Sequence, residues 1–324
     1  FNNKHERFME KYDPEKMELS TRDVVARAIN QEVNEGRGSP HGGAFLDISH
    51  KPADFIKRKL PSMYDQFYKL ADVDITKEPM EVAPTIHYAM SGVRVDAETG
   101  ASTLEGLFAA GEAACGLHGA NRLGGNSLSD LLVFGKRAGD GAAAYVAAGR
   151  KVVKGEPSQV AEAIEYTLAP LARVGGGDGS ESPYKIHAEL QDVMTRYAPI
   201  IREEKGLKVG LGKVKDLQER AATAGTGGQA GKAFNPGWHA ALDLQSMVDN
   251  AEAVFLCAIE RRESRGAHAR SDYPDLDEEL GKVNFVVAKH GKEMKLDSMA
   301  KEPIPAELRE AIEAKYTQDY TRED

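Results

Sequence analysis

The chain has 324 residues, and its 42 Lys or Arg against 51 Asp or Glu give a formal net charge of 42 − 51 = −9. This acidity argues against a general nucleic-acid-binding surface. A hydrophobic content of 41% with 29% charged residues is that of a folded globular protein rather than a disordered one, and the length predicts about two domains.

Cysteine usage and apolar runs bound the class of protein further. Cys115 and Cys257 form neither a disulfide framework nor a metal-ligand pattern, so we interpret them as buried thiols in a reducing compartment, and we expect no metal site. No apolar run reaches the roughly 18 residues that a membrane-spanning helix needs. We therefore expect any membrane contact to go through another protein.

The first part of the chain is predicted to alternate helix and loop. A helix is expected over 22–33, because the preceding Ser-Thr pair can cap it and apolar residues recur at helical spacing. Residues 45–49 alternate in the manner of a short strand. Residues 53–71 are predicted to be helical, with a break or kink at Pro61.

The next part contains the stretch richest in unusual chemistry. TIHYAM and GVRVD are predicted to be paired short strands, and TLEGLFAAGE a buried strand that ends in Gly-Glu. HGANRLGGNSLSDLLVFG then combines a glycine loop with the start of a helix that runs to about Ala148. Asn126 and Ser127 are good N-cap residues, and Leu128, Leu131, Leu132 and Phe134 are expected to begin its buried side. A helix N-terminus after such a loop favours an anionic or electron-rich ligand.

The remainder is predicted to be mostly helical. Residues 149–181 are a boundary region that ends in the glycine-rich loop GGGDGSES. Three helical segments follow, a strand with a possible partner comes next, and a charged tail ends the chain. The predicted ranges are 183–201, 212–222 and 239–263 for the helices, and 282–290 and 292–299 for the strands.

Four segments together resemble one protein family. HGANRLGGNSLSDLLVFG, preceded by LFAAGEAAC, closely resembles the flavoprotein subunit of succinate dehydrogenase and fumarate reductase. TRDVVARAI, PTIHYAMSG and RRESRGAHARSDYPD are similar to further segments of that family and stand in the family's order. The four motifs span the chain from Phe1 to about Pro274, which makes them much more specific together than singly.

The resemblance implies an α/β plus α fold, the C-terminal part of a two-dinucleotide-binding-type flavoprotein. The family's N-terminal FAD-binding unit has no counterpart in this sequence, so we expect the chain alone to bind FAD poorly and not to turn over. The implied parts are the end of a capping domain (1–83), the end of the FAD-binding domain (84–150), a helical bundle domain (151–279) and a strand-containing tail (280–324).

The resemblance also implies a cofactor and its contacts. In this family FAD accepts a hydride from succinate, and the reverse reaction reduces fumarate. Glu112 would accept from a hydroxyl of FAD, and Asn126, Ser127 and Leu128 would bring the helix N-terminus to the flavin ring. The helix dipole would then favour the negative charge that builds on the ring as it is reduced.

For the substrate, the resemblance implies that Arg122 and His87 hold the carboxylates of succinate or fumarate. Arg22 would transfer the proton, a role that requires a special environment because arginine in water holds its proton tightly. The residues alone leave other readings open. Arg22 near a helix start is compatible with a solvated side chain, with Arg27 nearby as a competitor. His118 either contacts the flavin region or shapes the loop.

Partners and alternatives complete the expectations. The resemblance implies an iron–sulfur protein subunit that links this chain to membrane anchor subunits, at the cytoplasmic face of the inner or plasma membrane. Ser91 departs from the family, which usually has glycine at that position of HYxMGG. Two alternatives remain: an L-aspartate oxidase-like flavoenzyme, which shares the HGANR and ESRG patterns, and a non-catalytic assembly module made of the helices between 183 and 263.

Overall fold

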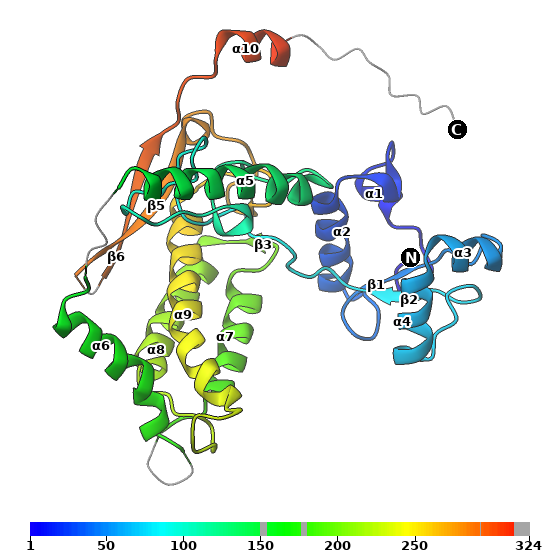
Figure 1. Ribbon diagram of the computed structural model, residues 1–324. Coiled ribbons are helices and arrows are strands. Elements are labelled where there is room, and N and C mark those ends of the chain that lie inside the picture. Colours follow the sequence, from blue (N-terminus) through cyan, green and yellow to red (C-terminus); the bar gives the residue numbers. More distant parts are fainter. Residues whose placement is uncertain (150–153, 176–179, 292, 314–324) are drawn as a thin grey trace. The chain divides into compact units, whose positions relative to one another are not determined.

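The structure, a computed structural model, describes residues 1–149, 154–175, 180–291 and 293–313. The chain is a mixed α/β protein dominated by helices, and it forms two compact units whose elements are labelled in Figure 1. Unit 1 comprises Phe1–Ala172, Ala198–Glu203 and Ser264–Asp272, and unit 2 comprises Arg173–Tyr197, Glu204–Glu263 and Tyr273–Asp324. The finer four-part division drawn from the sequence stays a prediction.

Unit 1 begins with short helices and a two-stranded antiparallel sheet, in which Phe45 pairs with Glu81. The predicted helix at 22–33, the short strand near 45 and the break at Pro61 are confirmed. Pro61 is the first residue of the second of two separate helices, where its missing N–H costs nothing. The elements are α1 (Met9–Tyr12), α2 (Arg22–Asn34), β1 (Ala44–Leu46), α3 (Ala53–Lys59), α4 (Pro61–Ala71) and β2 (Met80–Val82).

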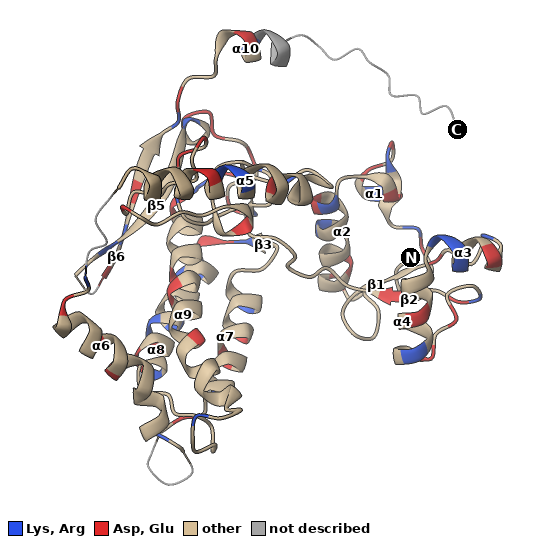
Figure 2. Cartoon of the chain, viewed as in Figure 1, with Lys and Arg blue, Asp and Glu red and all other residues tan. Residues whose placement is uncertain are grey.

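Two small apolar clusters support these elements. One joins the N-terminal segment to α2 and β1, and the other lies beneath α3 and β2 around Ile56, which is almost fully buried. Basic residues fill the last turn of α3 (Figure 2), where positive charge complements the negative end of the helix dipole. The buried members are Phe8, Met9, Ala28, Ile29 and Ala44 in the first cluster, and Ile56, Ile75 and Met80 in the second.

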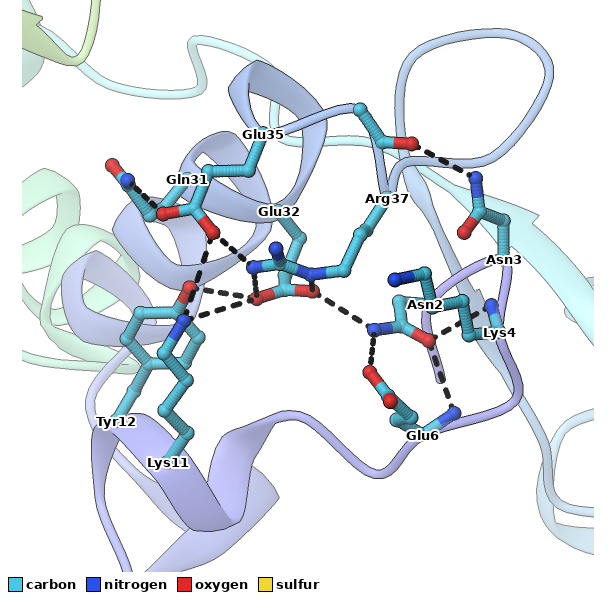
Figure 3. Close-up of polar contacts among 11 residues, drawn as sticks. Asn2, Asn3, Lys4, Glu6, Lys11, Tyr12, Gln31, Glu32, Glu35 and Arg37 are labelled. Carbon is cyan, nitrogen blue, oxygen red and sulfur yellow. Dashed lines mark hydrogen bonds and ion pairs between the residues drawn. The ribbon is translucent and has the colours of Figure 1, made fainter.

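A buried carboxylate, Glu32, fastens the N-terminal segment to α2 (Figure 3). Its side chain is 2% exposed, and the Arg37 guanidinium donates to its two oxygens at 2.6 and 2.7 Å. Asn2 donates to it at 2.9 Å and the Tyr12 hydroxyl at 2.7 Å. Arg37, with help from Asn2 and Tyr12, lowers the pKa of Glu32 to about 2. Burial, and then the hydrogen bond to Glu32, raise the pKa of Tyr12 to about 12.

Residues 83–125 follow an irregular path. The strands predicted for TIHYAM, GVRVD and TLEGLFAAGE are wrong, because this part of unit 1 holds isolated bridges and a short 3₁₀ turn instead of paired strands. A strand needs a ladder of bonds to a neighbour. Alternating side chains do not supply that neighbour. GVRVD makes two isolated bridges, TLEGLFAAGE makes one, and TIHYAM makes none. The bridges are Val93–Ala114, Val95–Ser102 and Ala101–Phe108.

Unit 1 ends with longer helices and a parallel pair of very short strands, which pair Ile201 with Ala269. The helix predicted to run to about Ala148 is confirmed as α5. The sequence did not predict α6, which lies in the expected boundary region. That region's residues 150–153 and 176–179 lie outside the described residues. The elements are α5 (Asn126–Ala147), α6 (Pro157–Leu168), β3 (Ile201–Arg202) and β4 (Ala269–Arg270).

Unit 2 is a three-helix bundle followed by a hairpin and a short helix. All three predicted helices and the strand pair are confirmed, although the second helix begins at Glu204 rather than near 212. Glycines weaken the helical signal there, yet Gly210 packs against the Phe255 ring, so tertiary contact overrides propensity. The elements are α7 (Pro183–Tyr197), α8 (Glu204–Ala221), α9 (Pro236–Glu260), β5 (Val283–His290), β6 (Glu293–Ala300) and α10 (Ala306–Glu313).

Three further expectations concern thiols, membranes and the tail. Cys115 and Cys257 are free thiols, but both are half-buried rather than fully buried, and burial raises the pKa of Cys257. Among the described residues, none of the helices combines the length and apolar character that crossing a bilayer requires. The charged tail beyond residue 313 lies outside the described residues.

The Glu32 network predicts that Arg37→Ala lowers the free energy of unfolding by about 3 kcal/mol, because it leaves the buried carboxylate with only the Lys11 ammonium, 3.9 Å from Oε1, as a cation. Urea unfolding at pH 7 measures this. The control is Arg7→Ala, which removes an equally bidentate pair with Glu18 whose side chains are 59% and 42% exposed, and it should cost less than about 1 kcal/mol. Equal losses in the two variants would contradict a special role for the buried pair.

The same carboxylate predicts a specific acid dependence. The pKa of Glu32 is about 2 in the folded protein against an ordinary value of 4.5, so its ionised form stabilises the fold above pH 4.5. That stabilisation is lost as the pH falls from 4.5 towards 2. We expect Glu32→Gln to destabilise the protein at pH 7 and the difference from wild type to shrink over this range. A pH-independent difference in urea midpoints would show that the carboxylate charge is not responsible.

Candidate functional site

The site is built around the start of α5 (green in Figure 1). The N-cap is Gly125, with φ of 81°, and not Asn126 or Ser127, which are the first two residues of the helix. The sequence-based N-cap assignment is therefore wrong, because a left-handed glycine can begin the helix where a capping side chain cannot. No side-chain hydrogen bond caps this end among the described residues. Two N–H groups of the first turn donate to backbone carbonyls instead, Asn126 to Leu123 and Leu128 to Gly125, each at 3.3 Å.

The buried face of α5 also differs from expectation. Leu128, Leu131 and Leu132 are 68%, 55% and 77% exposed, so the prediction that they begin its buried side is wrong. The buried residues of α5 are Asp130 and Ala138. This face is buried because its small residues let the helix backbone pack closely against the segment near residue 100. A Cβ on Gly141, on that same face, would lie 2.2 Å from the Thr99 carbonyl oxygen.

A buried polar cluster lies beneath the glycine loop. The Asp130 side chain is 4% exposed and its Oδ2 accepts from the Tyr88 hydroxyl at 3.1 Å. The same oxygen lies 3.2 Å from Nε2 of His118, whose side chain is also buried. The Tyr88 and His118 rings meet edge to face at 5.3 Å. Burial, and then the hydrogen bond to Asp130, raise the pKa of Tyr88.

Arg122 lies over this cluster, and its guanidinium has N–H donors that are not used in hydrogen bonds within the described residues. Its guanidinium carbon is 4.8 Å from the centre of the Tyr88 ring, a cation–π contact. One terminal nitrogen donates to the Leu123 carbonyl at 3.1 Å. Its Nε is buried and has no partner among the described residues. A fixed guanidinium with an unfilled buried donor is suited to binding a carboxylate.

The other predicted site residues reach this cluster to different degrees. Glu112 contacts the backbone next to this cluster, because its Oε1 accepts from the N–H of Ala89, the residue after Tyr88, at 2.8 Å. His87 is exposed on the other side of Tyr88. Arg22 is exposed at the start of α2, where it lines an open hollow of about 280 Å³ that includes neither His87 nor Arg122.

A glycine turn joins α2 to the loop that carries Arg122. Arg27, the competitor of Arg22 in the sequence, donates to the Gly266 carbonyl at 3.3 Å. Ala267 N–H donates to the Ala120 carbonyl at 3.0 Å. Gly266 has φ of 58°, and a Cβ there would lie 2.5 Å from the Ala120 oxygen. The RGAH turn therefore buttresses HGANR through backbone contact.

Sequence reasoning assigned no role to Tyr88, Asp130 or Gly266. The signal for Asp130 was its helical spacing from Ala138 and Gly141, which are eight and eleven residues later and therefore share one face. A carboxylate on the face of a helix that is otherwise small and apolar is expected to find buried donors. Gly266 carried no comparable signal, because its partner Ala120 is remote in the sequence.

Two family models match the chain. The model described as FAD binding domain matches residues 1–128, and the model described as Fumarate reductase flavoprotein C-term matches residues 187–316.

Among curated proteins, the chain is 43% identical over 275 residues to one of the subunits of the fumarate reductase (CoM/CoB) of Methanothermobacter marburgensis, covering 85% of this chain and 48% of that protein. It is 37% identical over 285 residues to the succinate dehydrogenase flavoprotein subunit of Coxiella burnetii, with coverage of 84% and 48%. The chain thus spans about half the length of the curated relatives it matches.

Solved structures agree. Mycobacterium smegmatis Sdh1 in complex with UQ1 matches with a TM-score of 0.78 and 46% identity over 91% of this chain and 49% of that one. The E. coli quinol fumarate reductase matches with a TM-score of 0.84 and 29% identity over 94% of this chain and 55% of that one. Adenylylsulfate reductase of Archaeoglobus fulgidus, at 19% identity and a TM-score of 0.68, shares the fold alone.

The tight turn predicts that Gly266→Ala destabilises the protein more than Gly42→Ala. Both glycines have positive φ, 58° and 82°, but a Cβ at Gly42 meets nothing within 4 Å. Each substitution carries about 1–2 kcal/mol of backbone strain, and Gly266→Ala adds about 1–3 kcal/mol of overpacking. Urea unfolding compares them, and hydrogen exchange at residues 118–122 should rise in Gly266→Ala alone. Equal effects would mean that the turn does not hold the loop.

Proposed function

The chain belongs to the succinate dehydrogenase and fumarate reductase flavoprotein family, and on this premise we propose that it supplies the dicarboxylate-binding residues of an FAD-dependent oxidoreductase that interconverts succinate and fumarate. The observation that carries the proposal is the buried, unpartnered Nε of Arg122, on a guanidinium already fixed over Tyr88. A guanidinium held this way is prepared for a carboxylate and needs little reordering when one binds.

The proposed roles follow from the chemistry of a dianion. Arg122 binds one carboxylate, and His87, exposed one residue before Tyr88, donates to the substrate as well. Arg22 is the proposed proton-transfer group, and its exposed position at the start of α2 leaves it accessible to a ligand. Succinate carries two negative charges, and cationic and N–H donor groups around it offset them. Without such groups, binding would remove the carboxylates from water with nothing to replace their hydration.

Residues of this chain also fit part of an FAD site. A Cβ at Gly124 or Gly125 would meet nothing within 4 Å among the described residues, so a flat ring can approach the backbone there. We propose that the first turn of α5, at Asn126, Ser127 and Leu128, faces the flavin. FAD, when bound, supplies the hydride acceptor. The dipole of α5, whose N-terminus no side chain caps among the described residues, then stabilises negative charge near it.

Glu112 has a compatible place in this arrangement. One of its carboxylate oxygens accepts from Ala89 N–H, which leaves the other to accept from a hydroxyl of the cofactor. The exposed Leu128, Leu131 and Leu132 form an apolar face of α5 beside this position. We propose that residues 1–83 and 84–150 are parts of the capping and FAD-binding domains, that 151–279 is the helical domain, and that 280–324 is a strand-containing tail.

Partners are proposed from the relatives. The E. coli neighbour is a quinol fumarate reductase and the mycobacterial neighbour is a complex with UQ1. We infer that electrons pass from this flavoprotein to an iron–sulfur subunit, which exchanges them with a quinone through membrane anchor subunits at the cytoplasmic face of the membrane. The described part of the chain contributes no membrane-spanning helix of its own to such an assembly.

Arg122→Ala tests the proposal in the FAD-loaded flavoprotein that contains this chain. We expect kcat/KM for succinate to fall by about 10²–10⁴-fold, because truncation of a charged hydrogen-bonding partner costs about 3–5 kcal/mol. Arg122→Lys should recover little, because lysine lacks the planar fork. Steady-state kinetics with succinate and fumarate measure both variants.

The matched control is Arg137→Ala in α5, the helix that follows the Arg122 loop. The Arg137 guanidinium contacts Phe134 and Glu98, and its removal should leave kcat/KM within about twofold of wild type. Wild-type turnover of aspartate in place of succinate would identify an aspartate oxidase instead. Normal turnover of succinate by Arg122→Ala in an intact assembly would contradict the catalytic proposal.

A further inference from the structure

The buried carboxylate of Asp130 makes two side-chain contacts that the proposed chemistry does not itself require. We propose that Asp130 is a positioning residue, which holds Tyr88 and His118 so that Arg122 and His87 keep the spacing that a dicarboxylate needs. This inference rests on the proposed function. It concerns no direct contact of Asp130 with substrate, because Asp130 lies beneath the loop and is 4% exposed.

The helix α5 fixes the position of Asp130. Asp130 belongs to α5, which Gly141 and Ala138 seat closely on the segment near residue 100, so its carboxylate has a fixed place. A buried carboxylate is costly unless donors reach it. Its Oδ2 accepts from the Tyr88 hydroxyl and adjoins His118, so both rings are tied to one atom of the helix.

Tyr88 links Asp130 to the proposed substrate-binding residues. Tyr88 stands directly after His87, and the N–H of the next residue, Ala89, is held by Glu112. Its hydroxyl is fixed by Asp130, and its face lies under the Arg122 guanidinium at 4.8 Å. Tyr88 is therefore fixed at the ring tip and at the adjacent backbone, and it connects the two proposed carboxylate-binding residues.

Asp130 does not neutralise the Arg122 guanidinium directly. Among the described residues, the ion-pair contact of Asp130 is with His118, and Arg122 forms no ion pair with it. The aromatic ring of Tyr88 stands in contact with both Asp130 and Arg122. Asp130 thus orients the Tyr88 ring that lies under the Arg122 guanidinium, but it does not accept hydrogen bonds from that guanidinium. The charge of Arg122 therefore stays available to an anion.

The experiment compares Asp130→Ala, Asp130→Asn, Tyr88→Phe and the double variant Asp130→Ala/Tyr88→Phe in the FAD-loaded flavoprotein that contains this chain. Calorimetry measures the Kd for malonate, a dicarboxylate that does not react. Kinetics give KM and kcat for succinate, and flavin absorbance gives the FAD content. The control is Asp140→Asn, which removes an exposed carboxylate from the same helix, where it pairs with Lys136.

We expect Asp130→Ala to raise the malonate Kd and the succinate KM by about tenfold or more, which corresponds to the loss of a buried hydrogen-bonded support. Tyr88→Phe keeps the aromatic ring under Arg122 but removes the hydroxyl that bonds to Asp130. It should therefore raise the malonate Kd and the succinate KM by about threefold to tenfold. Asp130→Asn keeps an acceptor for the tyrosine and should restore most of the affinity. The double variant should be no weaker than Asp130→Ala, because both substitutions break one link. Asp140→Asn should behave as wild type, and FAD content should be unchanged throughout.

The outcomes separate the two proposals. Wild-type protein that neither binds malonate nor oxidises succinate would overturn the proposed function. Wild-type protein that binds malonate, with Asp130→Ala and Tyr88→Phe binding it equally well, would overturn the positioning role alone. Additive losses in the double variant would do the same. If Asp130→Ala does not fold, Tyr88→Phe and Asp130→Asn decide, because an unchanged Kd in Tyr88→Phe contradicts the link.

Discussion

The close seating of α5 on the preceding irregular segment is the constraint on which the candidate site depends. Only a helix face made of small residues permits that approach, and at Gly141 a Cβ would press to 2.2 Å from a backbone carbonyl oxygen. The seating brings Asp130 within hydrogen-bonding distance of Tyr88 and His118, and it leaves the leucines of the opposite face exposed. The position of Arg122 over Tyr88 follows from it.

Two buried carboxylates in unit 1 show how similar chemistry serves different ends. Glu32 is bound bidentately by Arg37 and by two further donors, which together hold its pKa near 2. In that network the Arg37 guanidinium is paired with the carboxylate, and the pair stabilises the fold. Asp130 is also buried, but the nearby guanidinium of Arg122 contacts the Tyr88 ring and not the carboxylate. A cation kept near an acid but not neutralised by it retains its attraction for an outside anion.

The longer helices and the β5–β6 hairpin were predictable here, and the strands expected between residues 85 and 112 were not, for a physical reason. The helical segments at 22–33 and 239–263 carry their own hydrogen bonds and their own periodic face, so local sequence suffices. The stretches around His87 and Phe108 alternate like strands, yet the first makes no bridge and the second makes one, because pairing depends on remote neighbours. The family resemblance identified Arg122, His87 and Glu112 by motif. It did not identify Asp130, whose importance lies in contacts to residues distant in the sequence.

The turn at Gly266 is a second backbone contact that supports the site, and it comes from a segment remote in the sequence. Gly266 receives a hydrogen bond from Arg27 of α2 and abuts Ala120 of the loop that carries Arg122. The helix that begins at Arg22 and the loop that ends near Gly125 therefore share one support, contributed by a segment that follows both by more than a hundred residues. A side chain at this position would both strain the backbone and collide with the Ala120 carbonyl. The requirement for glycine therefore has two sources, which are the positive φ of the turn itself and the close approach of the loop that carries Arg122.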